Sequence, residues 1–182
     1  MDNILIYNND YEFLFHEYKY HFIERKFYEG KFSMRIPKSF VLMPESVKRI
    51  YQPGSQPEQL LLTDDSSQFS ISLLKTSDTL NKKIMEKQLN ICKTILPRMA
   101  SGVHIYEADI IKGDFQSLAY FEYTSDGMLE RMYNCMFLTG MNGHMVWGTI
   151  SFSYNNQSLK SLAKKISCSC HDITNMRYKN VK

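Results

Sequence analysis

The residues best suited to chemistry in this chain of 182 residues are its cysteines and histidines, and their tightest cluster is Cys168, Cys170 and His171. A structural zinc site normally draws a second ligand pair from a distant segment, and no Cys-x-x-Cys pair supplies one. The cluster also falls in a predicted helix, where residues two apart point to different sides. We therefore expect reduced thiols and no metal at this cluster.

A catalytic nucleophile with its base is equally hard to assemble. Cys170, His171 and Asp172 follow one another, but neighbours on a helix diverge by about 100° and cannot form a triad among themselves. Cys135 would have to meet a distant histidine, His104 or His144, and it falls on an apolar strand face where a buried thiol is inert. The glycines stand singly and form no phosphate-binding loop. The sequence therefore favours a non-enzymatic protein with no cofactor.

Charge and hydropathy exclude other classes. The net charge of +3, from 22 basic and 19 acidic residues, is too mild to indicate nucleic acid or an anionic membrane as a partner. No apolar run approaches the ~18 residues that cross a bilayer, and no signal sequence is recognisable after Met1, so we expect a cytoplasmic protein. Two predicted helices carry lysines that are interpreted as solvated faces: Lys82, Lys83, Lys87 and Lys93, and Lys160, Lys164 and Lys165.

The clearest structural signal lies between Phe115 and Tyr154, where the dipeptides Asp126-Gly127 and Asn142-Gly143 favour tight two-residue hairpin turns. We predict three antiparallel strands here. Two such turns would place Tyr120 opposite Tyr133, and Tyr133 opposite Phe152, on one buried face. They would also pair Glu122 with Arg131 at one end.

Periodicity predicts the other elements. A hairpin turns at Glu29-Gly30, and Pro37 and Pro44 bracket residues 39–43. Strands follow near 59–63, 69–73 and 103–111, and helices span 79–96 and 156–173. Thr79 or Asp78 would cap the first helix, and Asn155 or Asn156 the second. The buried stripe of the first helix comprises Met85, Leu89, Cys92, Leu96 and Met99, widened by Ile84, Ile91 and Ile95.

These elements define an α+β fold with a single antiparallel sheet of about six or seven strands, packed with two main helices. We divide the chain into an N-terminal arm, 1–19, one domain, 20–175, and a basic tail, 176–182. The arm is rich in aromatic residues that its own domain or another chain must bury, and sheet edges can pair with a second copy. These features slightly favour a homodimer over a monomer.

The sheet face opposite Tyr120 combines a small or polar centre with an aromatic wall, as a peptide or ligand groove requires. The candidate partner-binding residues on it are Trp147, Phe115, Met136, Leu138, Asn134 and Thr149. The alternative interpretation is that the second helix covers this face and that Trp147 packs beneath it.

The order of elements, with an opening strand that ends in proline in "KFSMRIPKSF" (Lys31 to Phe40), resembles the PsbP-like superfamily. That superfamily includes the photosystem II protein PsbP, the yeast Ran-binding Mog protein and bacterial DcrB-like domains of unknown function. The resemblance covers about residues 20–175 and concerns topology. It implies a protein that binds another protein, as an adaptor or an assembly-assisting domain. The alternative is a small-molecule-binding or enzymatic domain that uses the concave sheet face.

Overall fold

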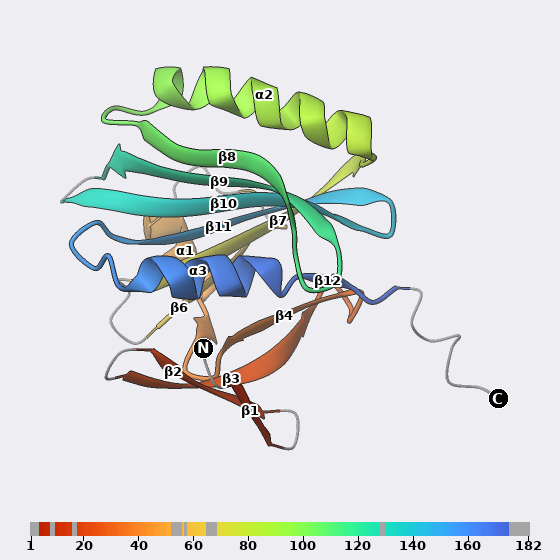
Figure 1. Cartoon of the computed structure of the whole chain (residues 1–182), viewed down its shortest axis with the longest axis vertical. Coiled ribbons are helices and arrows are strands. Elements are labelled where there is room, and N and C mark those ends of the chain that lie inside the picture. Colours follow the sequence, from red (N-terminus) through yellow and green to blue (C-terminus); the bar gives the residue numbers. More distant parts are fainter. Residues whose placement is uncertain are drawn as a thin grey trace.

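The computed structural model describes residues 4–7, 10–15, 18–51, 56, 58–64, 69–127 and 130–174, with side chains described within residues 20–174. In this part of the chain, antiparallel strands form two sheets that are packed with three helices (Figure 1). The predicted α+β class is confirmed. The predicted N-terminal arm contributes strands, whereas its side chains and the basic tail, 176–182, lie outside the described residues.

The larger sheet has seven strands in the order β5-β6-β7-β11-β10-β9-β8. Their bounds are β5 (Val41–Leu42), β6 (Leu60–Thr63), β7 (Phe69–Thr79), β8 (His104–Lys112), β9 (Ser117–Asp126), β10 (Arg131–Met141) and β11 (His144–Ser153). The second sheet has five strands in the order β1-β2-β3-β4-β12. Their bounds are β1 (Ile4–Tyr7), β2 (Asp10–Phe15), β3 (Tyr18–Phe27), β4 (Phe32–Pro37) and β12 (His171–Asp172).

The prediction of a single sheet is wrong because the hairpin β3–β4 does not join the seven-stranded sheet. It pairs instead with β2 on one side and with β12 on the other. In Figure 1 this second sheet lies below the seven-stranded sheet, and α3 lies across the seven-stranded sheet.

The hairpin β10–β11 has the predicted register. Asn142 and Gly143 both have positive φ, 51° and 77°, as a two-residue turn of this type requires. Tyr133 therefore pairs with Phe152.

The hairpin β9–β10 does not have the predicted register. Arg131 pairs with Asp126, so the connection is longer than two residues, and Tyr120 pairs with Phe137 and not with Tyr133. The wider loop is closed by Gly127 N, which donates to Glu130 O at 2.8 Å. The shift is four residues, and an even shift keeps every side chain on its face of the sheet.

Glu122 is displaced by the same shift and pairs with Cys135 in place of Arg131. Tyr120, Tyr133 and Phe152 still share one core, while Trp147 packs on the opposite face.

Helix α2 (Lys82–Met99) begins later than predicted because β7 continues to Thr79. Its cap is Asn81, whose Oδ1 accepts a hydrogen bond from Ile84 N at 2.9 Å. The helix includes Pro97 in its last turn and ends at Met99, three residues beyond the predicted end at Leu96.

Helix α3 (Leu159–Cys168) is shorter than predicted, and Ser158 takes the N-cap position. Ser169 ends it: its Oγ donates to Ile166 O at 2.6 Å and accepts from Arg35 N at 3.0 Å. The chain then continues as β12 beside β4, so the expectation that His171 is helical is also wrong. A third, short helix, α1 (Glu45–Tyr51), was not predicted.

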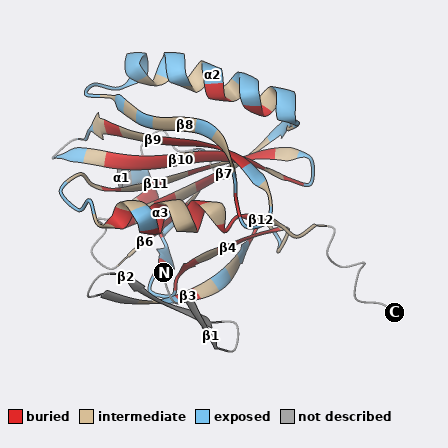
Figure 2. Cartoon of the chain, in the orientation of Figure 1, coloured by how far each residue is buried: buried red, intermediate tan, exposed pale blue. Residues whose placement is uncertain are grey.

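The two faces of the seven-stranded sheet are covered by different helices. Ile166 of α3 packs in the larger core with Tyr120, Tyr133, Phe137 and Phe152. On the other face, α2 buries Met85 and Leu89 against a smaller core (Figure 2). Among the described residues, no helix is both long and apolar enough to cross a membrane.

Candidate binding face around α2

The structure gathers three of the predicted partner-binding residues beneath α2. Trp147 and Met136 are half-buried, Leu138 is fully buried, and all three pack in the smaller core with Met85 and Leu89 of α2. Helix α2, and not the second predicted helix, therefore contacts this face. A partner cannot contact Leu138 in this arrangement.

Phe115 lies apart from these residues, before β9. Its side chain is 46% exposed, and its ring stacks on that of His171 with centroids 4.0 Å apart. The guanidinium of Arg35 lies 5.3 Å from the Phe115 ring centroid and pairs with Asp114 at 3.3 Å. Phe115 thus belongs to the junction of the two sheets.

In the predicted polar centre, Asn134 is hydrogen-bonded to two neighbouring serines. Ser151 Oγ donates to Asn134 Oδ1 at 2.8 Å, and Asn134 Nδ2 donates to Ser125 Oγ at 3.1 Å. Asn134 is 6% exposed. Thr149 lies half-buried in the neighbouring ladder, opposite Met136. Side chains that satisfy one another in this way stabilise the sheet and leave few polar groups for a ligand.

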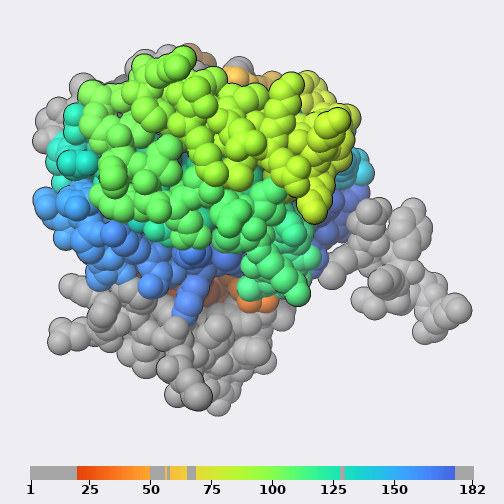
Figure 3. All heavy atoms as spheres, turned by 45° about the horizontal axis from the view of Figure 1, so that its top comes forward, coloured from red at the N-terminus to blue at the C-terminus, as the bar shows by residue number. Residues whose placement is uncertain are grey.

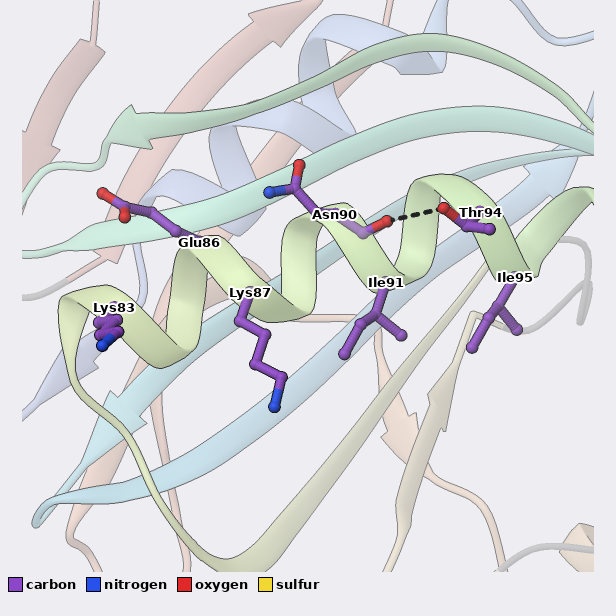
Figure 4. A pocket seen from close by; sticks show the side chains of 7 residues that line it. All are labelled: Lys83, Glu86, Lys87, Asn90, Ile91, Thr94 and Ile95. Carbon is purple, nitrogen blue, oxygen red and sulfur yellow. Dashed lines mark hydrogen bonds between the residues drawn. The ribbon is translucent and has the colours of Figure 1, made fainter.

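The outer surface of α2 carries a hollow of about 630 Å³, which Figure 4 shows from close by. Two rows of side chains with a spacing of four residues border it, and such rows are the ridges of a helix surface. One row is Lys83, Lys87, Ile91 and Ile95, and the other is Glu86, Asn90 and Thr94. The hollow therefore follows the groove between two adjacent ridges, which we call the α2 groove.

The α2 groove is open to solvent. Figure 3 shows α2 lying across the surface of the molecule. In Figure 4, Ile91 and Ile95 leave the helix on the side opposite to Glu86 and Asn90. Ile95 is 41% exposed, and Met99, one step further along the same row, is 77% exposed. Ile95 was predicted to widen the buried stripe and Met99 to belong to it. Both predictions are wrong, because α2 rests mainly on β8 and β9 and its flank extends beyond that contact.

Helix α2 is also strongly basic. Its single acidic residue is Glu86, whereas the whole chain has a net charge of only +3. Five basic residues lie on it, and none makes an ion pair with another described residue: Lys82, Lys83, Lys87, Lys93 and Arg98. Sequence reasoning identified the lysines but not the apolar row beside them.

A second cluster of polar groups joins α3 to the sheet. The hydroxyls of Tyr120 and Tyr133 donate to Glu122 at 2.8 and 2.5 Å, and Lys164 of α3 pairs with Glu107 at 2.7 Å. Burial, followed by the contact with Glu122, raises the pKa of Tyr133, and burial also dominates the raised pKa of Tyr120. Both phenols therefore remain protonated hydrogen-bond donors, and the cluster stabilises the sheet and its contact with α3.

The thiols are poorly suited to nucleophilic chemistry. Burial raises the pKa of Cys135 to about 12, and burial also holds the pKa of Cys170 well above its ordinary value. His144 Nδ1 lies 3.0 Å from Ser77 O, and His104 packs edge-on against Tyr106. The described residues contain no group of three or more side chains that could hold a metal ion.

No family model matches the sequence, and no curated protein matches it. Among solved structures, the chain is similar to cyanobacterial PsbP (CyanoP) from Synechocystis sp. PCC 6803, with a TM-score of 0.60 and 13% identity over 83% of this chain and 92% of that one. It is also similar to a protein of Bacteroides thetaiotaomicron VPI-5482, with a TM-score of 0.51 and 10% identity over 82% of this chain, which spans 47% of that protein. The chain therefore has a PsbP-like fold, as its element order predicts.

Proposed function

We propose that this chain is a non-enzymatic protein-binding domain, an adaptor or assembly-assisting protein, that holds another protein against the outer surface of α2. The observation that carries the proposal is the α2 groove, an exposed hollow of about 630 Å³ bordered by isoleucines on one side. A helix whose only role was to cover the sheet would bury all of its apolar residues against the sheet, as α2 buries Met85 and Leu89. The exposed row with Ile95 and Met99 gives α2 a second apolar surface, which is typical of interaction sites.

The alternative, a small-molecule-binding or enzymatic domain on the concave sheet face, has less support. Its polar centre around Asn134 is hydrogen-bonded internally, and α2 packs over the neighbouring Leu138. The buried thiol of Cys135 and the phenols on Glu122 have raised pKa values, which suits stability better than catalysis. Nucleic acid is a poorer partner as well, because α2 has no aromatic residue on which bases could stack.

The compartment and the self-association form part of the same proposal. All four cysteines are free, which suits the reducing cytoplasm. Among the described strands, the outer strand β8 (His104–Lys112) pairs with β9 alone, and this edge supports the predicted homodimer. Light scattering of the wild-type chain tests the dimer independently of the α2 groove.

A pull-down with a blocked groove tests the main proposal. Asn90→Trp fills the groove with a bulky neutral side chain, and Ser161→Trp adds the same side chain on exposed α3 surface as a matched control. Both variants are first checked for wild-type circular dichroism. We expect a protein from the native source that the wild type and Ser161→Trp retain and that Asn90→Trp loses. Equal retention of every bound protein by all three baits would contradict the proposal.

A further inference from the structure

The α2 groove has two chemically different halves. Along one row, Lys83 and Lys87 border the N-terminal half, and Ile91 and Ile95 border the C-terminal half. Successive members of the row are four residues apart, so each step rises about 6 Å along the helix axis. A partner that fills the groove therefore meets Lys83 and Lys87 first, with Glu86 on the other row, and then an apolar surface.

The lysines at this end oppose the electrostatics of their own helix. The first turn of α2 contains Lys82 and Lys83 and no acidic residue. The helix macrodipole disfavours cations at an N-terminus and favours anions there. Neither lysine has an ion pair with another described residue to compensate. An acidic group of a partner would supply the missing negative charge.

The shape of the groove favours a helix as the occupant. A groove between two rows with four-residue spacing accepts the corresponding ridge of another helix, the commonest mode of helix packing. The partner residues that enter it are then also four apart, so acidic residues can face Lys83 and Lys87 while apolar residues face Ile91 and Ile95.

A second copy of this chain fits the groove less well. Helix α3 carries Lys160, Lys164 and Lys165 without an acidic residue, and α1 carries one acidic and two basic residues. All three described helices are thus more basic than acidic, and a helix of a second copy would bring like charges together.

We propose that the α2 groove binds an amphipathic helix of another protein, with acidic residues against Lys83 and Lys87 and apolar residues against Ile91 and Ile95. This inference rests on the proposed function and specifies the chemistry of the partner.

The test uses a synthetic helical peptide as its probe. One half carries glutamates at i, i+4 and the other half carries leucines at i, i+4, and binding to the whole chain is followed by fluorescence anisotropy. Lys83→Glu combined with Lys87→Glu reverses the charges inside the groove. Lys82→Glu combined with Lys93→Glu changes the net charge equally at positions outside the groove. We expect the first pair to weaken binding about tenfold or more, and the second pair less than about threefold.

The apolar half has its own variant, Ile91→Gln combined with Ile95→Gln, which we expect to weaken binding by about tenfold. Equal weakening by the two charge-reversed pairs would overturn the inference, because the attraction would then be unspecific. So would binding of phosphatidylserine vesicles by a chain that does not bind the peptide.

These outcomes are separable from failure of the proposed function. If the peptide does not bind and the pull-down partner still depends on Asn90, the groove remains the binding site and only the acidic helix is wrong. If the pull-down is unaffected by Asn90→Trp, the proposed function itself fails.

Discussion

Replacing Gly148 by alanine should destabilise the protein, because the added Cβ would overlap one neighbouring side chain. Gly148 lies in β11 directly opposite Phe137 of β10, whose side chain is fully buried. A Cβ on residue 148 would come within 2.5 Å of Cε2 of Phe137, and closer still to Cε1 and Cζ. The ring must move within a closed core, and such overpacking costs about 1–3 kcal/mol. We therefore expect the free energy of unfolding to fall by that amount and Tm to fall by about 2–4 °C per kcal/mol.

Gly140→Ala is the matched control for this prediction. Gly140 is also a strand glycine of the same sheet, but a Cβ there would meet Leu80 Cδ2 at an ordinary 3.6 Å. We expect its cost to stay within about 0.5 kcal/mol in urea unfolding. Phe137→Leu replaces the ring with a smaller side chain. In that background, Gly148→Ala should lower the free energy of unfolding by less than it does in the wild type. If the two glycine variants were equally stable, the packing of Phe137 on Gly148 would be refuted.

Three further predictions concern stability. Asn81→Ala should lower the free energy of unfolding by about 1 kcal/mol because its side chain caps α2, whereas Ser158→Ala, which removes no capping hydrogen bond, should cost less than about 0.5 kcal/mol in the same urea titration. Burial raises the pKa of Cys135 and of Tyr123 to about 12, so the folded state holds these protons more tightly than the unfolded state. This stabilisation is complete below pH 9.0 and is lost as the pH rises towards about 12, and a melting temperature that stays constant over this window would contradict it. Glu122→Ala leaves two tyrosine hydroxyls without their acceptor and should cost about 1–3 kcal/mol in thermal or urea unfolding, and an unchanged midpoint would show that the hydroxyls find other partners.

Local turn chemistry was sufficient to predict one register and insufficient for another. Asn142-Gly143 determines the β10–β11 register because both residues adopt the positive φ that the turn requires. Asp126-Gly127 has the same type of sequence, but Asp126 N donates to the distant Ser101 O at 3.0 Å, and the loop is wider. That contact depends on where the chain returns after α2, which a dipeptide cannot indicate.

The second sheet and the end of α3 were missed for a similar reason. The helical pattern after Leu159 continues past Cys168, yet Ser169 bonds to Arg35, which is 134 positions away in the chain. This pairing draws His171 and Asp172 into β12 and away from the helix. The hydrophobic periodicity of the sequence cannot reveal a long-range contact that competes with the helix.

The candidate site was partly predictable. The aromatic face around Trp147 was correctly placed opposite Tyr133, because side chains alternate along strands regardless of the shifted register. The exposure of Ile95 was not predictable, since a hydrophobic stripe does not show how far a sheet extends beneath its helix. Phe115 was grouped with Trp147 by strand alternation, but β9 begins only at Ser117.

Site-specific photo-cross-linking tests the central claim, that the α2 groove holds another protein. A photoreactive phenylalanine analogue is placed at Thr94, which borders the groove, and in a second variant at Ser161 on the exposed surface of α3. After irradiation in the native source, we predict a discrete cross-linked adduct with another protein from position 94 and none from position 161. Irradiation that gives no adduct at position 94, or the same adducts at both positions, would contradict the account.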